Sequence, residues 1–143
     1  MIQVERLTKK FQTHTALNQI SVSVQPGSVF GLVGSNGAGK STTMNIMCGV
    51  LKQTEGEVFI KGVSMRENPV EAKRYIGFLP QKPPLYNDLT VEEFLAFTAN
   101  IRRIPTGEVA EAIKVVMGRC GLSHFRKRLV RNLSGGYQQR LGI

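Results

Sequence analysis

Residues 34–41 read Gly34-Ser35-Asn36-Gly37-Ala38-Gly39-Lys40-Ser41, and this stretch decides the fold. It matches the pattern G-x-x-x-x-G-K-[ST]. An apolar segment, Val29–Val33, precedes it, and a helical pattern follows it with apolar residues at Met44, Met47, Cys48 and Leu51. A glycine-rich loop between a strand and a helix presents backbone N–H groups to an anion at the positive end of the helix dipole. The sequence therefore predicts a P-loop that binds the phosphates of a nucleoside triphosphate.

Each residue of the predicted P-loop has an expected role. The loop backbone surrounds the phosphates, and it comprises Gly34, Ser35, Asn36, Gly37, Ala38 and Gly39. Lys40 is expected to reach the β and γ phosphates. Ser41 is expected to supply a hydroxyl ligand to Mg²⁺, and Thr42 to contact the α phosphate. The ligands predicted from these residues are a nucleoside triphosphate and Mg²⁺.

Two kinds of strand surround the P-loop. Ile20–Gln25 and Glu57–Lys61 mix apolar and polar positions, as half-exposed antiparallel strands do, and Ile2–Leu7 is expected to pair with them. Val29–Val33 and Tyr75–Leu79 are apolar on both faces, which favours parallel strands covered by helices. The predicted fold class is α/β, with an antiparallel β subdomain beside a parallel sheet.

The chain after residue 87 has helical patterns. Thr90 and Glu93 form a T-x-x-E capping box. A second helix is predicted before Gly121, with an apolar stripe at Val109, Ala112, Ile113, Val116, Met117 and Cys120. Residues 1–87 are therefore expected to form the nucleotide-binding core, and residues 88–143 a helical subdomain.

Composition excludes several classes of protein. The 143 residues are 41% hydrophobic and 20% charged, which is typical of a folded globular chain rather than a disordered one. No apolar run approaches the roughly 18 residues of a membrane-spanning helix. The start of the chain lacks the features of a secretory signal, and the two cysteines, Cys48 and Cys120, are isolated. A reducing cytoplasm is the expected compartment.

A second motif lies near the end of the chain, at Leu133-Ser134-Gly135-Gly136-Tyr137-Gln138-Gln139-Arg140. It contains L-S-G-G-x-Q-x-R. Ser134 stands where it would cap a helix, and the two glycines leave the first backbone N–H groups open to an anion. With the P-loop, this signature motif makes the whole chain resemble the ATP-binding subunit of ABC transporters. The resemblance implies a P-loop ATPase of the ABC type.

The resemblance implies further binding residues. In the family, the signature helix binds the γ phosphate of ATP held by a second subunit, through positions equivalent to Ser134, Gly135, Gly136 and Gln138. Phe11 stands where an aromatic ring stacks on adenine, although a phenylalanine at a strand end also suits a core. Gln81 resembles the Q-loop glutamine that contacts Mg²⁺ and the attacking water. The alternative is that Gln81 is an ordinary exposed loop residue with no role in binding. Lys40 and Gln81 are the residues expected to take part in catalysis.

The resemblance also implies partners and a location. ATP-driven dimerisation and hydrolysis would power transport through a transmembrane permease, contacted near Gln81–Tyr86, with the subunit peripheral on the cytoplasmic face of the membrane. A soluble ABC-type ATPase that uses Arg126–Arg131 on ribosomes or nucleic acid is the alternative, and an inactive remnant is a third. Nucleic acid is not favoured, because soluble relatives usually carry duplicated or strongly inserted domains and this chain has one P-loop and one signature motif.

The sequence departs from the family in its acidic residues. Hydrolysis in the family needs an aspartate and a glutamate after an apolar strand, the Walker B region, and a later histidine. The one aspartate is Asp88, which begins a helix, and His14 and His124 both precede the signature motif. We therefore expect a truncated chain that lacks the Walker B half, has an incomplete parallel sheet and is inactive alone. Val29–Val33 and Tyr75–Leu79 are expected to be exposed.

Overall fold

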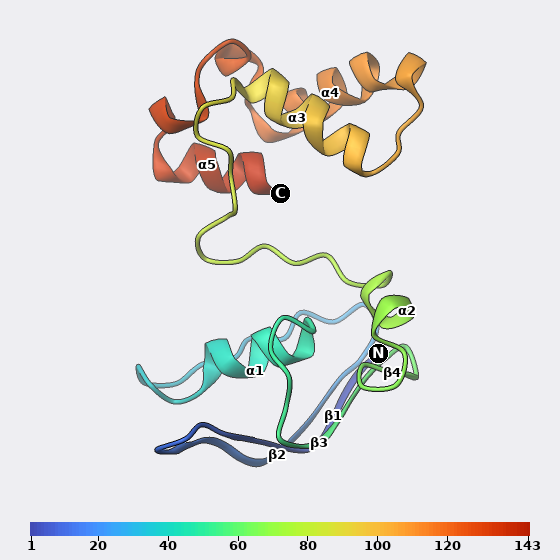
Figure 1. The fold of residues 1–143 in the computed structure, drawn as a ribbon, viewed down its shortest axis with the longest axis vertical. Coiled ribbons are helices and arrows are strands. Elements are labelled where there is room, and N and C mark those ends of the chain that lie inside the picture. The colour runs from blue at the N-terminus through green and yellow to red at the C-terminus, as the bar shows by residue number, and fades with distance from the viewer. The chain divides into compact units, whose positions relative to one another are not determined.

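The computed structural model describes residues 1–143, which divide into a sheet unit of residues 1–78 and a helical unit of residues 79–143 (Figure 1). The sequence suggests a boundary between residues 87 and 88. The structure groups residues 79–87 with the helical unit, because their backbone hydrogen bonds are made there. The carbonyl of Gln81 accepts from Gln139 Nε2 at 2.5 Å, and the carbonyl of Asn87 accepts from the Arg131 N–H at 3.2 Å.

An antiparallel sheet with strand order β2-β1-β3-β4 organises the sheet unit. Its strands are β1 (Ile2–Lys10), β2 (Thr15–Val24), β3 (Glu55–Ile60) and β4 (Val63–Ser64). Strand β1 lies in the middle, and its Ile2 is opposite Val24 on one side and Ile60 on the other. These pairings confirm the prediction of three half-exposed antiparallel strands, and each strand contains both buried apolar and exposed polar residues.

Helix α1 (Lys40–Met47) covers one face of this sheet (Figure 1). Ile46 and Met47 are buried in a core shared with the strands. The predicted apolar face is partly wrong, because Met44 is 44% exposed. The helix ends at Met47 and the chain turns at Gly49, whose φ of 66° requires glycine, so Leu51 lies beyond the helix. A short helix, α2 (Pro69–Lys73), follows β4 and completes the unit.

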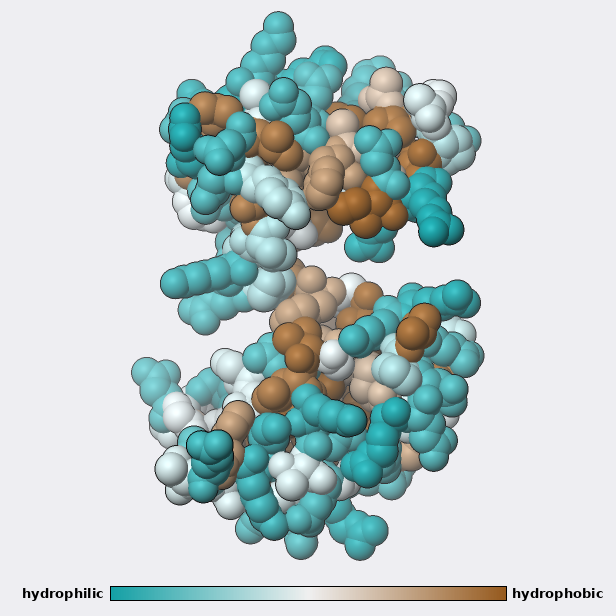
Figure 2. Space-filling model, viewed as in Figure 1, coloured by the Kyte–Doolittle hydropathy of each residue, from teal (hydrophilic) through white to brown (hydrophobic).

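The two apolar segments predicted as parallel strands form no strand. Neither Val29–Val33 nor Tyr75–Leu79 pairs with any other segment of the chain. A strand exists only through hydrogen bonds to a neighbour, and apolar composition alone does not provide one. Val29 is 102% exposed and Val33 93% exposed, so the expected exposure is observed in the first segment. In the second segment Ile76 and Leu79 are half-buried, and Ile76 packs against the core of the sheet unit. Figure 2 shows hydrophobic surface on the sheet unit. The α/β class is confirmed, whereas the two-strand prediction is wrong.

The helical unit contains three α-helices and two short 3₁₀ helices. They are α3 (Val91–Ile101), α4 (Thr106–Cys120), η1 (Ser123–Phe125), η2 (Val130–Asn132) and α5 (Gly135–Gly142). Both predicted helix signals are confirmed: Thr90 and Glu93 form the capping box at the start of α3, and Gly121 ends α4 in the left-handed conformation. The core of the unit includes Val91, Ile113 and Leu133. No helix is both long and apolar enough to span a bilayer.

Two distant segments, residues 87–92 and 126–131, run side by side in the helical unit. The Val130 N–H donates to the Leu89 carbonyl at 2.9 Å, and the Val91 N–H donates to the Arg128 carbonyl at 3.0 Å. The pairing is flanked by an ion pair between Arg126 and Glu92. Hydrogen bonds from Arg126 hold the pKa of Glu92 below its usual value. This 87–92/126–131 pairing joins the two ends of the segment that contains α3 and α4.

Candidate functional site

The P-loop enters helix α1 through Gly39, the N-cap residue. Gly39 has a φ of 86°, a left-handed conformation that costs an L-residue roughly 1–2 kcal/mol. A Cβ atom here would lie 2.5 Å from Leu17 Cδ2 and 2.8 Å from the Ala16 carbonyl oxygen. Glycine is therefore required twice, by the backbone angle and by close packing against β2. This packing fixes the start of α1 on the sheet unit.

Lys40 folds back over the loop that precedes it. Its Nζ donates hydrogen bonds to the carbonyl of Gly34 at 2.8 Å and to the carbonyl of Ser35 at 2.7 Å. The ammonium group therefore lies at the loop whose backbone is expected to hold the phosphates. Thr43 Oγ1 donates to the Gly39 carbonyl at 3.0 Å and anchors the first turn of α1 from its buried side.

The remaining P-loop residues are open to solvent. Residues 34–38 are all exposed, and the Ala38 N–H donates to the Ser35 carbonyl at 3.2 Å, which makes the loop a tight turn. Gly37 has a φ of 85°, and nothing lies within 4 Å of where its Cβ would be. Ser41 is exposed and Thr42 half-buried on the first turn of α1. The loop is therefore open to solvent from Gly34 to Ala38.

The signature motif places Ser134 at the N-cap of α5. Ser134 is extended, with a φ of −64° and a ψ of 157°, and its side chain makes no capping hydrogen bond. Gly135 and Gly136 are exposed, and nothing lies within 4 Å of where either Cβ would be. The first N–H groups of a helix have no partner within the helix. At α5 no side chain caps them, and Gly135 and Gly136 have no Cβ atom beside them.

Helices α1 and α5 differ from the other α-helices in charge at their N-termini. Neither has a side-chain cap or an acidic residue in its first turn. The first turns of the other three contain a carboxylate, which comes from Glu71 in α2, Glu92 and Glu93 in α3, and Glu108 in α4. A carboxylate there offsets the positive end of the helix dipole. Only the two predicted phosphate-binding helices leave that potential free.

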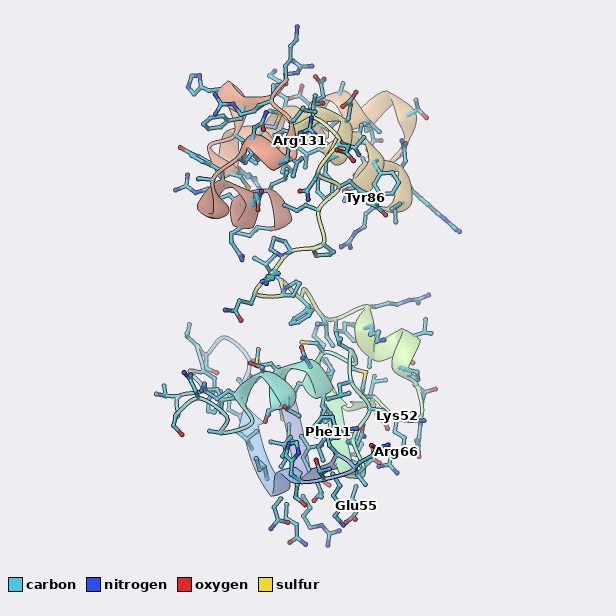
Figure 3. The ribbon with its side chains drawn as sticks, turned by 60° about the vertical axis from the view of Figure 1, so that its left-hand side comes forward. Phe11, Lys52, Glu55, Arg66, Tyr86 and Arg131 are labelled. Carbon is cyan, nitrogen blue, oxygen red and sulfur yellow. The ribbon has the colours of Figure 1, made fainter.

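Phe11 lies in the turn between β1 and β2, in the sheet unit (Figure 3). Its side chain is 41% exposed and therefore is not a core residue. The ring stacks on His14, with centroids 5.4 Å apart, and the ammonium of Lys9 lies 5.1 Å from the ring centroid. An exposed aromatic ring on the strand pair that supports the P-loop is compatible with base stacking.

Three glutamines connect the signature helix to the rest of the helical unit. The side chain of Gln138 is half-buried, and its Nε2 donates to the Val130 carbonyl at 3.2 Å, so this amide serves packing within the unit. Gln139 Nε2 donates instead to the backbone carbonyl of Gln81. Gln81 itself is exposed. Sequence reasoning missed Gln139, because no local pattern indicates a bond between residues so far apart along the chain.

In the sheet unit, the Ser41 hydroxyl is the one predicted protein ligand for the Mg²⁺ of a bound nucleotide. Mg²⁺ usually keeps waters and takes substrate phosphates plus one or two protein oxygens, and the exposed Ser41 hydroxyl suits one such position. No group of three or more His, Cys, Asp or Glu side chains in the chain is arranged to hold a metal ion. Any Mg²⁺ here would therefore depend on the nucleotide for most of its ligands.

An α/β fold with the P-loop pattern at the head of α1 defines the class of P-loop proteins. The family model described as ABC transporter matches residues 17–143, and the chain belongs to that family. Curated relatives agree. The probable multidrug ABC transporter ATP-binding protein YbhF of Escherichia coli K12 is 35% identical over all of this chain and 25% of its own length. The bacitracin transport ATP-binding protein BcrA of Bacillus licheniformis is 36% identical over all of this chain and 46% of its own length.

Solved structures give the same result. A dimeric post-hydrolysis structure of the ATP-binding cassette MJ0796, bound to ADP and Pi, matches 99% of this chain and 67% of its own with a TM-score of 0.85 and 26% identity. The cbiO1 protein of Clostridium perfringens, part of the cbiONQ transporter complex, matches 99% of this chain and 58% of its own with a TM-score of 0.82 and 25% identity. The chain thus spans a quarter to just under half of YbhF and BcrA.

Proposed function

We propose that this chain is part of an ATP-binding subunit of an ABC transporter and that its two open helix N-termini bind ATP phosphates. The observation that carries the proposal is the free positive potential of α1 and α5, each of which lacks a cap and a first-turn carboxylate. Both helices begin at a motif that the family resemblance assigns to nucleotide binding. Two independent features, sequence and local charge, therefore select the same two positions.

At the P-loop, the proposal gives each group a task. The backbone of residues 34–39 and the first N–H groups of α1 hold the phosphates. Lys40 exchanges its bonds with the carbonyls of Gly34 and Ser35 for bonds to phosphate oxygens, in which the acceptor as well as the donor is charged. Ser41 supplies one oxygen to Mg²⁺, and Thr42 meets the α phosphate.

At the signature motif, the proposed ligand is the γ phosphate of an ATP molecule bound by a second ATP-binding subunit. Ser134, Gly135 and Gly136 are exposed and leave the amide N–H groups accessible. Gln138 contributes indirectly, because its bond to the Val130 carbonyl holds α5 against η2. The relative MJ0796 is described as dimeric and bound to ADP and Pi, which supports an arrangement with two subunits.

We further propose that residues 1–143 bind ATP without hydrolysing it at a useful rate. Hydrolysis in P-loop ATPases requires a carboxylate that organises Mg²⁺ and a group that orients the attacking water. The one aspartate, Asp88, lies in the turn before α3 rather than at the start of a helix, and it is paired with Arg131 at 3.2 Å. Gln81 is the remaining candidate from the sequence, and a neutral amide is a poor base. Hydrolysis and transport belong to the complete protein.

The proposed membrane partner is a permease that contacts the helical unit near Gln81–Tyr86, which places the complete subunit on the cytoplasmic face of a membrane. Tyr86 is 55% exposed and packs edge-on against Phe97 at 5.0 Å. Such an exposed aromatic pair suits an interface between proteins. The names of YbhF and BcrA describe ATP-binding proteins of transporters, in support of this partner class.

The alternative of nucleic-acid binding is weakened by what the basic residues contact. Arg126 is paired with Glu92, Arg131 with Asp88, and Arg128 lies over the Phe125 ring at 4.8 Å. Of the basic residues in this segment, Lys127 alone has no such contact. A nucleic-acid surface needs several cations free to replace counterions at phosphates. The cluster is better explained as support for the 87–92/126–131 pairing.

The test is the affinity of the 143-residue chain for a non-hydrolysable ATP analogue with Mg²⁺, measured by calorimetry. Lys40→Ala is expected to weaken binding at least about 10-fold, because a hydrogen bond to a charged group contributes roughly 1.5–3 kcal/mol. The matched control is Lys114→Ala, which removes the same charge from an exposed position in α4. Equal affinities for the Lys40 variant and the wild-type chain would contradict the P-loop assignment.

A further inference from the structure

His14 and Phe11 form a stacked pair of rings at the turn between β1 and β2. Their ring planes are 26° apart, and the Phe11 backbone N–H donates to the His14 carbonyl at 2.8 Å. The same turn therefore fixes both residues. His14 is an exposed residue, so burial does not explain its contact with Phe11. The imidazole stacks on the phenyl ring and the Lys9 ammonium lies 5.1 Å from the ring centroid, while 41% of Phe11 stays exposed.

This ring pair is connected to the P-loop through β2. Ala16 and Leu17 are the second and third residues of β2, and both lie against Gly39, where a Cβ atom would meet the Leu17 side chain and the Ala16 carbonyl. The turn and the start of α1 are thus held by neighbouring residues of one strand. The ring pair and the P-loop therefore belong to the same unit and are connected through the first residues of β2.

We propose that His14 is a positioning residue for a purine base: by stacking on Phe11, it holds the phenyl ring so that the base stacks on the open part of that ring. The proposal rests on the proposed function, because it requires a nucleotide at the P-loop. Holding the ring in place before binding lowers the entropy that binding must remove. Stacking does not depend on the hydrogen-bonding groups of the base, so the stacked ring should increase the affinity for ATP and for GTP by similar amounts.

The experiment compares ATP, GTP and inorganic tripolyphosphate as ligands of the full 143-residue chain, each with Mg²⁺. His14→Ala is expected to weaken ATP and GTP binding about 2- to 10-fold, the range that one aromatic pair accounts for, and to leave tripolyphosphate affinity unchanged. His14→Phe restores a stacking ring and should recover most of the loss. His124→Ala, which changes the other histidine of the chain at an exposed position, is the matched control.

Tripolyphosphate separates positioning from a structural role. If His14 merely kept the turn folded, its loss would disturb the packing of Leu17 on Gly39, and tripolyphosphate affinity would fall as much as ATP affinity. That result overturns the inference and leaves the P-loop assignment intact. The inference is also wrong if His14→Ala binds both ATP and tripolyphosphate with unchanged affinity. Absence of any tripolyphosphate binding that depends on Lys40 would instead overturn the proposed function, and the role of His14 with it.

Discussion

The N-termini of α1 and α5 both begin at glycine-rich motifs, yet their glycines serve different physical needs. Gly39 has a left-handed φ of 86° and is wedged against Leu17. Gly135 and Gly136 have ordinary helical backbones, and nothing lies within 4 Å of where their Cβ atoms would be. Gly39 is thus required by its backbone angle and its packing, whereas glycine at the signature motif is needed only if a ligand approaches. The comparison distinguishes a glycine that the backbone conformation requires from glycines that leave amide groups accessible to a ligand.

The largest expected effect comes from Gly39→Ala. The added methyl group combines a strained φ with overlap against Leu17 and Ala16, so the sheet unit should lose about 2–4 kcal/mol of stability. The measurement is urea unfolding followed through amide resonances of β1 to β3. A loss below about 0.5 kcal/mol would show that the loop relaxes freely, and the conformational role of Gly39 would be wrong.

Two matched variants divide this effect into its parts. Gly37→Ala has a similar positive φ of 85° in open space, so it should cost only the strain, about 1 kcal/mol. Gly136→Ala lies on a helical backbone in open space and should not destabilise the helical unit, because alanine restricts the unfolded chain. A destabilising Gly136→Ala would contradict the distinction between the two motifs.

The second prediction compares the caps of α3 and α5. Thr90→Ala breaks a complete capping box and should cost the helical unit about 1 kcal/mol. Ser134→Ala removes no capping bond and should cost less than about 0.5 kcal/mol. Both values come from amide exchange in the core of the helical unit. Equal losses for the two variants would show that Ser134 does cap α5 and that its amides are not free.

The smallest expected effect is a pH dependence restricted to the helical unit. Hydrogen bonds from Arg126 lower the pKa of Glu92, and the backbone N–H of Thr90 lowers the pKa of Glu93. A lowered folded-state pKa stabilises the fold above the ordinary glutamate pKa of about 4.3, and this contribution is lost as the pH falls through the lowered value.

Acid titration of the two units tests this prediction. Between about pH 5 and pH 3 the helical unit should lose some stability, and a variant with both Glu92→Gln and Glu93→Gln should lose less over the same range. Glu111→Gln, a change on the exposed surface of α4, is the control. An unchanged acid response in the double variant would place the pH sensitivity elsewhere.

Local signals in the sequence predicted local structure well. The capping box of Thr90 and Glu93 and the C-terminal Gly121 depend on bonds within a few residues, so the pattern was sufficient. The antiparallel strands followed from alternation of polar and apolar residues. Helix α2 was missed, although Asn68-Pro69 is a usable signal, because proline is favoured at the first helical position.

Predictions that needed a distant partner failed or were never made. Val29–Val33 has the composition of a strand, but no segment lies beside it to accept its hydrogen bonds. The bond from Gln139 to the Gln81 carbonyl and the stacking of His14 on Phe11 depend on three-dimensional neighbours. For the candidate site, the sequence indicated which loops matter, and the structure showed which of their amides and rings are open.

The 87–92/126–131 pairing has a consequence for how members of this family can diverge. The pairing brings together both ends of the segment between residues 92 and 126. Helices α3 and α4 therefore belong to a long insertion whose first and last residues are hydrogen-bonded to each other. Loop closure depends weakly on length, at about 0.6 kcal/mol for each doubling. Insertions or deletions around the turn at Arg103 can therefore change the size of this segment without shifting the residues that lead into the signature motif.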